Sequence, residues 1–191
     1  MNDPVTTSPP SRKLLVLDLD ETLVHATEQA LDVQADFQVG PYFVYRRPHL
    51  DEFIRRTSAL FDIGIWTSSG EVYAAQVIER LFPADLLRFI WSSRRCTLAR
   101  DPLTGEYSSV KNLHKLKKHG FNLESIIAVD DTPSKYGRHY GNLVRVSEFV
   151  GDAGDRLADY LDMLAHVGNV RSIEKRGWRK AMESRISQRQ E

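Results

Sequence analysis

Three short, largely apolar runs, each ending in a polar cluster, constrain the fold of this chain more than any other feature of its sequence. The runs are residues 14–17, 61–66 and 126–129. The polar residues that follow them are Asp18 and Asp20, then Thr67, Ser68 and Ser69, and finally Asp130 and Asp131. Runs of this kind predict strands buried on both faces of a parallel sheet. Since ligands bind at the carboxyl ends of such strands, we expect the three clusters to form one site.

Amphipathic segments alternate with these strands and predict a Rossmann-like, three-layer α/β fold with a central parallel sheet. Pro48 opens one helix, and residues 71–82 form another. Residues 37–47, aromatic around Gly40-Pro41, indicate a hairpin or flap. The other expected elements are a strand at 89–91, a turn within 99–107, a short helix that includes Val110 and stops at Gly120, a strand at 143–146 and a helix at 155–166.

The length and the ends of the chain favour one folded domain. The 191 residues leave little room for two full cores. Residues 1–12 are polar and rich in proline, without the apolar segment of a secretory signal, and we expect a disordered leader there. The domain then covers residues 13–168. Residues 169–191 are expected to form a polar, basic helix or tail, with seven basic and three acidic residues from Arg171 onward.

Composition excludes several classes of partner. Lys and Arg total 26, as do Asp and Glu, so the formal net charge is zero, which argues against a nucleic-acid coat protein. No apolar run approaches the ~18 residues of a membrane-spanning helix. Cys96 is the only cysteine, which excludes an intramolecular disulfide and favours a reducing, cytoplasmic compartment. The sequence does not reveal the oligomeric state.

The acidic residues at the strand ends indicate a magnesium site with phosphoryl-transfer chemistry. Four carboxylates in one crevice repel one another unless a cation lies among them, and an all-oxygen site suits Mg²⁺. An Asp carboxylate can attack phosphorus and form an aspartyl-phosphate, while a second acid moves the protons. The remaining charge requires a hydroxyl and an ammonium group, and Thr67 and Lys111 lie where such groups are expected.

Four segments, in this order, resemble the haloacid dehalogenase superfamily. They are LVLDLDETLVH from Leu15, WTSS from Trp66, SVKNL from Ser109 and VDDTPSKY from Val129. With the RPHLDEF segment from Arg47, the set is similar to the phosphatases of the RNA polymerase II C-terminal domain and their small relatives. The resemblance covers about residues 13–167 and implies a phosphoric monoester hydrolase with small flap insertions and no large cap domain.

The resemblance implies a role for each matching residue. Asp18 would be the nucleophile and a Mg²⁺ ligand. Asp20 would be the general acid and base, with its backbone carbonyl on the metal. Thr67 would bind a phosphoryl oxygen and Lys111 would neutralise the phosphoryl group. Asp130 and Asp131 would hold Mg²⁺; many eukaryotic members have Asp-Asn here, which leaves the direct ligand open.

Further contacts with phosphate or substrate are expected around this set. Thr22 would shape the first loop, and the backbone amides of Ser68 and Ser69 could face phosphate. Tyr73, with Phe43 and Tyr45, could line the entrance to the crevice. The intervals from Asp18 to Thr67 and from Thr67 to Lys111 leave no room for a large cap, so an open crevice favours a phosphorylated protein side chain over a free metabolite.

Three alternatives compete with this interpretation, and the order of the motifs argues against one of them. One is a non-catalytic phosphopeptide-binding or scaffolding protein with the same fold. A receiver domain has similar residues but places its acidic pair first and its acceptor later, which is the reverse of the order here. The third is a phosphotransferase or phosphomutase, whose acceptor is not water. The sequence does not distinguish Ser, Thr or Tyr as the leaving group.

Overall fold

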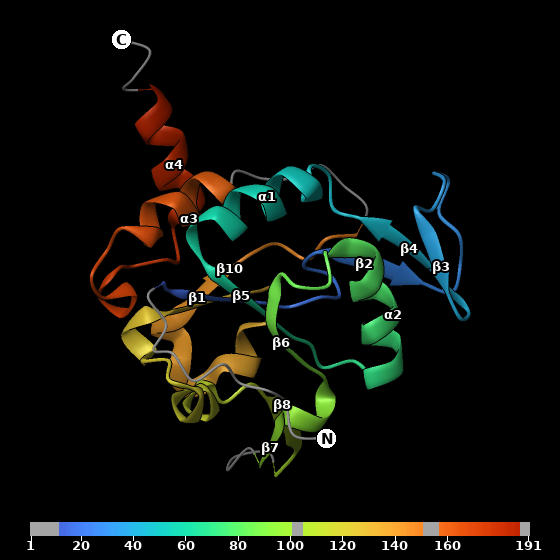
Figure 1. Ribbon diagram of the computed structural model, residues 1–191, viewed down its shortest axis with the longest axis horizontal. Helices are drawn as coiled ribbons and strands as arrows, with labels where there is room; N and C mark the ends of the chain where they lie inside the picture. The colour runs from blue at the N-terminus through green and yellow to red at the C-terminus, as the bar shows by residue number, and fades with distance from the viewer. Residues whose placement is uncertain (1–11, 101–104, 151–156, 188–191) are drawn as a thin grey trace.

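A five-stranded parallel sheet forms the centre of the protein, in the order β10-β9-β1-β5-β6 (Figure 1). The computed structural model describes residues 12–100, 105–150 and 157–187; the expected leader, apart from Arg12, lies outside them. The strands are β1 (Leu14–Leu17), β5 (Asp62–Trp66), β6 (Leu87–Trp91), β9 (Ile126–Asp130) and β10 (Leu143–Arg145). This arrangement confirms the predicted α/β class.

The pleat of β1 explains the three layers. All four of its residues are fully buried, because β5 and β9 pair with its two edges and a hydrophobic core packs on each of its faces. Leu15 and Leu17 face one core, and Leu14 and Val16 face the other. Alternate residues of a strand point to opposite faces, so a strand covered on both sides contains an unbroken apolar run.

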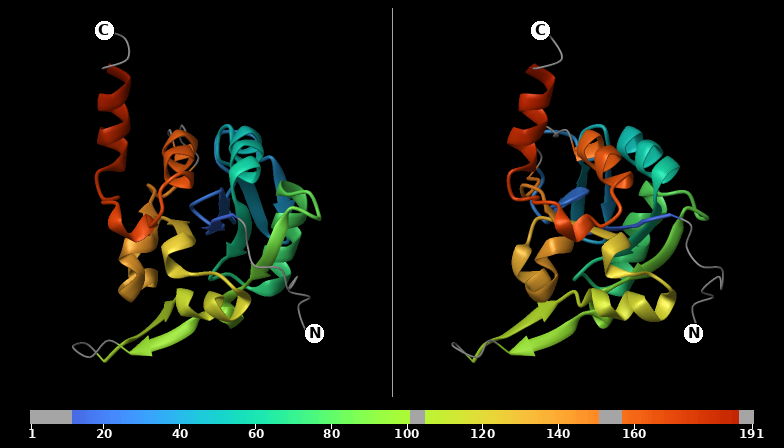
Figure 2. Two further views of the ribbon diagram at one scale, coloured as in Figure 1. Left: turned by 60° about the vertical axis from the view of Figure 1, so that its left-hand side comes forward. Right: turned by 90° about the vertical axis from the view of Figure 1, so that its left-hand side faces the viewer.

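Helices cover both faces of the sheet (Figures 1 and 2). The first core includes residues of α1 (Leu50–Leu60), α2 (Glu71–Leu81) and α3 (Leu157–Ala165). The second core lies under two 3-10 segments, η2 (Leu113–His119) and η4 (Pro133–Asn142). Among the described helices, none is long and apolar enough to cross a membrane.

Two small antiparallel sheets extend from this frame. The flap consists of β2 (Val24–Thr27), β3 (Phe37–Val39) and β4 (Tyr42–Arg46), in the order β2-β4-β3. The turn between β3 and β4 places Gly40 at a φ of 56°, which glycine adopts at little cost. The expected hairpin is therefore present, but β2 was not predicted, because its four residues VHAT lack a distinctive apolar pattern.

The segment before Lys111 differs from the expectation. The apolar spacing predicts a helix that includes Val110, but this residue ends the strand β8 (Tyr107–Val110), which pairs with β7 (Thr97–Arg100). The helix that follows begins only at Leu113 and is 3-10. A spacing of three between apolar residues fits a 3-10 turn as well as an α-helix, and a strand can precede it. Part of the expected turn, residues 101–104, lies outside the described residues.

The basic C-terminal segment includes a structured anchor. A turn at Val170–Ser172 leads to α4 (Trp178–Ser187), which projects from the body of the protein (Figure 2). The Trp178 side chain is 3% exposed and stacks on Tyr160, with 5.2 Å between ring centroids. Its Nε1–H donates to the carbonyl oxygen of Arg145 at 2.8 Å. The first residue of α4 therefore packs on the domain.

Candidate active site

A tight loop after β1 places the first two aspartates. The carbonyl oxygen of Leu19 accepts hydrogen bonds from the amides of Leu23, at 2.8 Å, and Val24, at 3.2 Å. Glu21 has a φ of 59°, in the left-handed region, which turns the chain back sharply. Asp18 is 1% exposed at the carboxyl end of the central strand. The loop thus holds Asp18 and Asp20 at the edge of the sheet.

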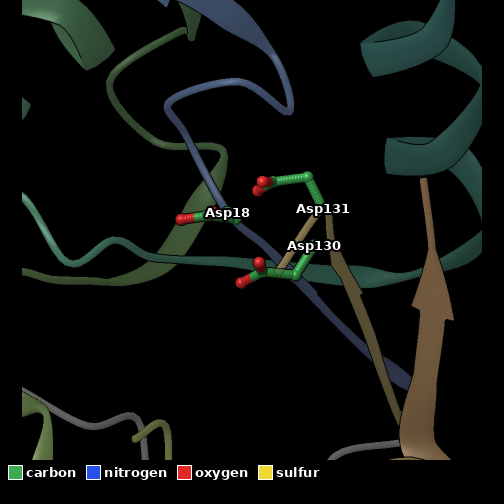
Figure 3. A group of neighbouring side chains, drawn as sticks. All are labelled: Asp18, Asp130 and Asp131. Atoms are coloured by element: carbon green, nitrogen blue, oxygen red, sulfur yellow. The ribbon is translucent and has the colours of Figure 1, made fainter. Parts of the chain in front are cut away.

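Three carboxylates meet at this edge (Figure 3). One oxygen each of Asp18, Asp130 and Asp131 lies within 4.8 Å of the other two. Asp18 follows β1, while Asp130 ends the neighbouring strand β9 and Asp131 comes next in the chain. Asp18 and Asp130 are buried, and Asp131 is half-buried. We call these three residues the acidic group.

Two lysines lie against the acidic group. Nζ of Lys111 is 2.7 Å from Asp18 Oδ1 and 2.5 Å from Asp130 Oδ2, and its side chain is fully buried. Nζ of Lys135 is 3.4 Å from Asp18 Oδ2 and 3.8 Å from Asp130 Oδ1. The amide of Lys111 also donates to the carbonyl oxygen of Lys135 at 2.7 Å, so the two lysines are held together.

Burial and charge set the electrostatics of this cluster. Burial, followed by repulsion from Asp18, raises the pKa of Asp130 to about 6, against the opposing attraction of Lys111. Burial acts to lower the pKa of Lys135, but the surrounding carboxylates outweigh it, and the net shift is upward. A buried carboxylate prefers to be neutral unless a cation stabilises it. The lysines offset only part of the charge of the three carboxylates.

This donor set fits a divalent cation. Carboxylate oxygens are the ligands that Mg²⁺ prefers, and it commonly takes one or two of them together with waters. The acidic group supplies three such side chains, of which Asp131 is half-buried and within reach of solvent. Thr22 Oγ1 lies 3.5 Å from Asp131 Oδ1, and Thr132 Oγ1 donates to Asp131 Oδ2 at 2.8 Å, which orients that carboxylate.

Asp20 occupies a different environment. Its carboxylate accepts three hydrogen bonds from hydroxyl groups: from Tyr73 at 2.7 Å, from Ser69 at 2.6 Å and from Thr67 at 3.2 Å. It is not a member of the acidic group. Burial, followed by the charge of Asp20, raises the pKa of Tyr73. The Tyr73 hydroxyl therefore stays protonated and donates a hydrogen bond to the Asp20 carboxylate. Two neighbouring carboxylates thus have separate partners.

The structure brings most of the expected site residues together at one edge of the sheet. Thr67 follows β5, is 1% exposed and directs its hydroxyl to Asp20. Ser68 Oγ is buried and has no hydrogen-bond partner among the described residues. Tyr45, expected at the entrance, is instead 4% exposed, and its hydroxyl oxygen accepts a hydrogen bond from the amide of Leu31.

Sequence reasoning missed two residues of this site. Lys135 lies within the VDDTPSKY segment, where the resemblance implies no role for it, and its position in the helical turn after Asp131 is the signal that indicates it. For Ser69 the sequence indicates a loop residue whose backbone amide could face phosphate, yet its side chain donates a hydrogen bond to Asp20. Its signal was the spacing of two from Thr67, whose Oγ1 accepts a hydrogen bond from the Ser69 amide at 3.0 Å.

Comparisons with known proteins identify relatives of this chain. An uncharacterized protein of Schizosaccharomyces pombe is 31% identical over 179 residues, covering 89% of this chain but only 52% of the relative. CTD nuclear envelope phosphatase 1 of Xenopus tropicalis is 30% identical over 185 residues, covering 86% of this chain and 72% of the relative. Human carboxy-terminal domain RNA polymerase II polypeptide A small phosphatase 1 is 32% identical over 173 residues, covering 83% of this chain and 62% of the relative.

A solved structure and a family model complete the comparison. The fission yeast RNA polymerase II CTD phosphatase matches with a TM-score of 0.55 at 19% identity, over 93% of this chain and 50% of that one, which supports the fold alone. The family model of NLI interacting factor-like phosphatases matches residues 13–174. This match confirms the resemblance drawn from the four sequence segments: the chain belongs to the NLI interacting factor-like phosphatase family.

Proposed function

We propose that this chain is a Mg²⁺-dependent phosphatase that hydrolyses phosphomonoesters through an aspartyl-phosphate on Asp18. The observation that carries the proposal is that two aspartates only two residues apart contact different kinds of side chain. Asp18 lies between the ammonium groups of Lys111 and Lys135, at 2.7 and 3.4 Å, whereas Asp20 accepts hydrogen bonds from three hydroxyl groups. One carboxylate is suited to attack a phosphoryl group and the other to move protons.

The two half-reactions use these residues in turn. A carboxylate oxygen of Asp18 attacks phosphorus, the bond from phosphorus to the leaving oxygen breaks, and protonated Asp20 gives its proton to that oxygen. Asp20, now a carboxylate, then takes a proton from the water that attacks phosphorus, and Asp18 is released. The hydroxyls of Tyr73 and Ser69 hold the Asp20 carboxylate in place between the steps.

Charge stabilisation falls to the lysines and the cation. Lys111, which contacts Asp18 and Asp130, would neutralise charge on the phosphoryl oxygens. Mg²⁺ would be held by Asp18, Asp130 and Asp131, with the Asp20 backbone carbonyl as a further candidate ligand, and would supply positive charge for binding phosphate. Thr67 would reorient its hydroxyl from Asp20 to a phosphoryl oxygen when substrate is bound, and the amides of Ser68 and Ser69 would add donors.

We further propose a phosphorylated protein side chain as the substrate. Between Asp18 and Lys111 the described residues form the sheet strands β5 and β6, the flap, α1, α2, a short 3-10 turn and the β7–β8 hairpin, without a separate cap domain. An open site admits a side chain on a large partner. We also propose a reducing, cytoplasmic location, for which the free thiol of Cys96 is the support. The leaving group stays open among Ser, Thr and Tyr.

Hydrolysis of p-nitrophenyl phosphate tests the proposal directly. We expect turnover with Mg²⁺, none with excess EDTA, and a loss of several orders of magnitude in Asp18→Asn, whose folding is checked by circular dichroism. A panel of phosphopeptides should be hydrolysed with higher kcat/KM than a panel of phosphorylated metabolites. A folded protein that binds phosphopeptides without turnover would instead be the scaffolding alternative, and a preference for metabolites would overturn the substrate class.

A further inference from the structure

A hollow with a strongly positive lining lies next to the candidate active site. Its volume is about 680 Å³, within the range of ligand sites. Four cationic side chains line it, Arg145, Arg171, Lys175 and Arg176, against the single carboxylate of Glu174 among the described lining residues. Pro133 and Tyr140 contribute an apolar wall, and the Tyr140 side chain is 58% exposed. We call this surface the basic hollow.

The basic hollow is built from the strand and turn beside the acidic group. Arg145 ends β10 and is in register with Asp130 on the neighbouring strand β9. Pro133 is the second residue after Asp131 and begins η4. The segment after α3 closes the other side, where Nη1 of Arg171 donates to Asn142 Oδ1 at 2.7 Å. A substrate bound at Asp18 therefore has the basic hollow as a neighbouring surface.

The cations of the basic hollow differ in how they are engaged. Nζ of Lys175 is buried and donates to the carbonyl oxygens of Gly141 and Ile173, both at 2.8 Å, and of Val170. Arg176 pairs with Glu174 at 2.9 Å. The exposed Arg145 guanidinium has no partner among the described residues; the hydrogen bond at this position uses its backbone carbonyl. Arg145 is thus the cation available to a ligand.

The balance of charge indicates the chemistry of that ligand. Four cations and one carboxylate leave a net charge of +3, which a dianionic group offsets better than a carboxylate does. A phosphoserine carries about −1.5 to −2 charges, and its oxygens match the forked guanidinium of arginine. We propose that the basic hollow binds a second phosphorylated residue of the same peptide, so that multiply phosphorylated segments are the preferred substrates. This inference rests on the proposed phosphatase function.

The test compares matched peptides that carry one phosphoserine or two, with the second at several spacings from the first. For the wild-type protein we expect kcat/KM to be about tenfold higher with two phosphoserines at the best spacing, since a charge-assisted contact contributes at least that factor. Arg145→Gln should lose most of this preference for the doubly phosphorylated peptide. Arg145→Lys, which keeps the positive charge but lacks the forked guanidinium, should keep part of the preference. Arg55→Gln, an exposed arginine on α1 outside the basic hollow, should keep all of it.

Two further arms separate the possible failures. Fluorescence anisotropy with Asp18→Asn measures the ratio of the peptide Kd values without turnover, so an inactive protein still tests the second site. Glutamate in place of the second phosphoserine should give less than half of the gain. Equal affinities for both peptides at every spacing, or an unchanged ratio in Arg145→Gln, would overturn the second site while leaving the phosphatase assay intact. Displacement by a short oligonucleotide, with no gain from a second phosphate, would make the basic hollow a nucleic-acid surface and our assignment wrong.

Discussion

Removal of the Trp178 indole tests whether the basic C-terminal segment belongs to the folded domain. The family model ends at residue 174, so this anchor lies beyond the part of the chain that the family defines. The indole is 3% exposed, stacks on Tyr160 and donates to the Arg145 carbonyl oxygen at 2.8 Å. Truncation of a buried Trp to Ala costs about 3–5 kcal/mol, because the packing is lost and a cavity remains.

We therefore expect Trp178→Ala to lower the free energy of unfolding by about 3–5 kcal/mol, a large share of the ~5–15 kcal/mol of a typical domain. Trp178→Phe keeps most of the stacking but leaves the Arg145 carbonyl without its donor, and should cost about 1–2 kcal/mol. Lys180→Ala, an exposed change on the same helix, should stay within about 0.5 kcal/mol of wild type.

Urea denaturation followed by far-ultraviolet circular dichroism gives these values without relying on the tryptophan that is removed. The slope against denaturant should be the same for all four proteins, so that the midpoints report stability. A loss of less than about 1 kcal/mol in Trp178→Ala would refute the reasoning, since no well-packed indole can be removed at that cost. It would mean that α4 does not rest on the domain in solution.

Three other perturbations address the site and its surroundings. Lys111→Met leaves two buried carboxylates without their shared ammonium group. We expect the free energy of unfolding to fall by about 3–5 kcal/mol and kcat on p-nitrophenyl phosphate to fall at least a hundredfold. A near-normal kcat would contradict the role of this lysine. Mg²⁺ at about 100 times its Kd should raise the free energy of unfolding by about 2.7 kcal/mol, and Asp131→Asn should require more Mg²⁺ for the same increase. A denaturation midpoint that is the same with and without Mg²⁺ would contradict the metal site. Burial lowers the pKa of His139 to about 4, below its unfolded value near 6.5, so the unfolded chain takes up the proton first and stability falls as the pH drops through this interval. His139→Gln should make this fall shallower by about 2 kcal/mol at pH ~5, measured by urea denaturation, and an identical pH profile would contradict it.

The sequence by itself was sufficient to predict the sheet and the edge of the sheet at which the candidate site residues meet. The strands that lead to Asp18, Thr67 and Asp130 are short apolar runs. Such runs can be recognised in the sequence because a strand that is covered on both faces buries every residue. The polar residues after them had to meet at one edge, since parallel strands place their carboxyl ends together. No knowledge of long-range contacts is needed for that inference.

Tertiary packing decided what each side chain contacts. Asp18 and Asp20 are two residues apart, yet one lies against lysines and the other against hydroxyls, because the loop turns back at Glu21. Lys135 reaches Asp18 from 117 residues away, a distance over which no local pattern carries information. Strand pairing placed Val110 in β8, since the hydrogen bonds of a hairpin outweigh the weak helical preference of its spacing.

The C-terminal segment shows most clearly which properties can be predicted from the sequence and which depend on tertiary packing. Its charge was evident from composition, and the basic residues that line the hollow beside β10 come partly from it. Composition averages over residues and does not distinguish an exposed tryptophan from one that fills a cavity. Only the fold places Trp178 on Tyr160 and Arg145 beside Asp130, because burial depends on which distant elements provide a surface of matching shape.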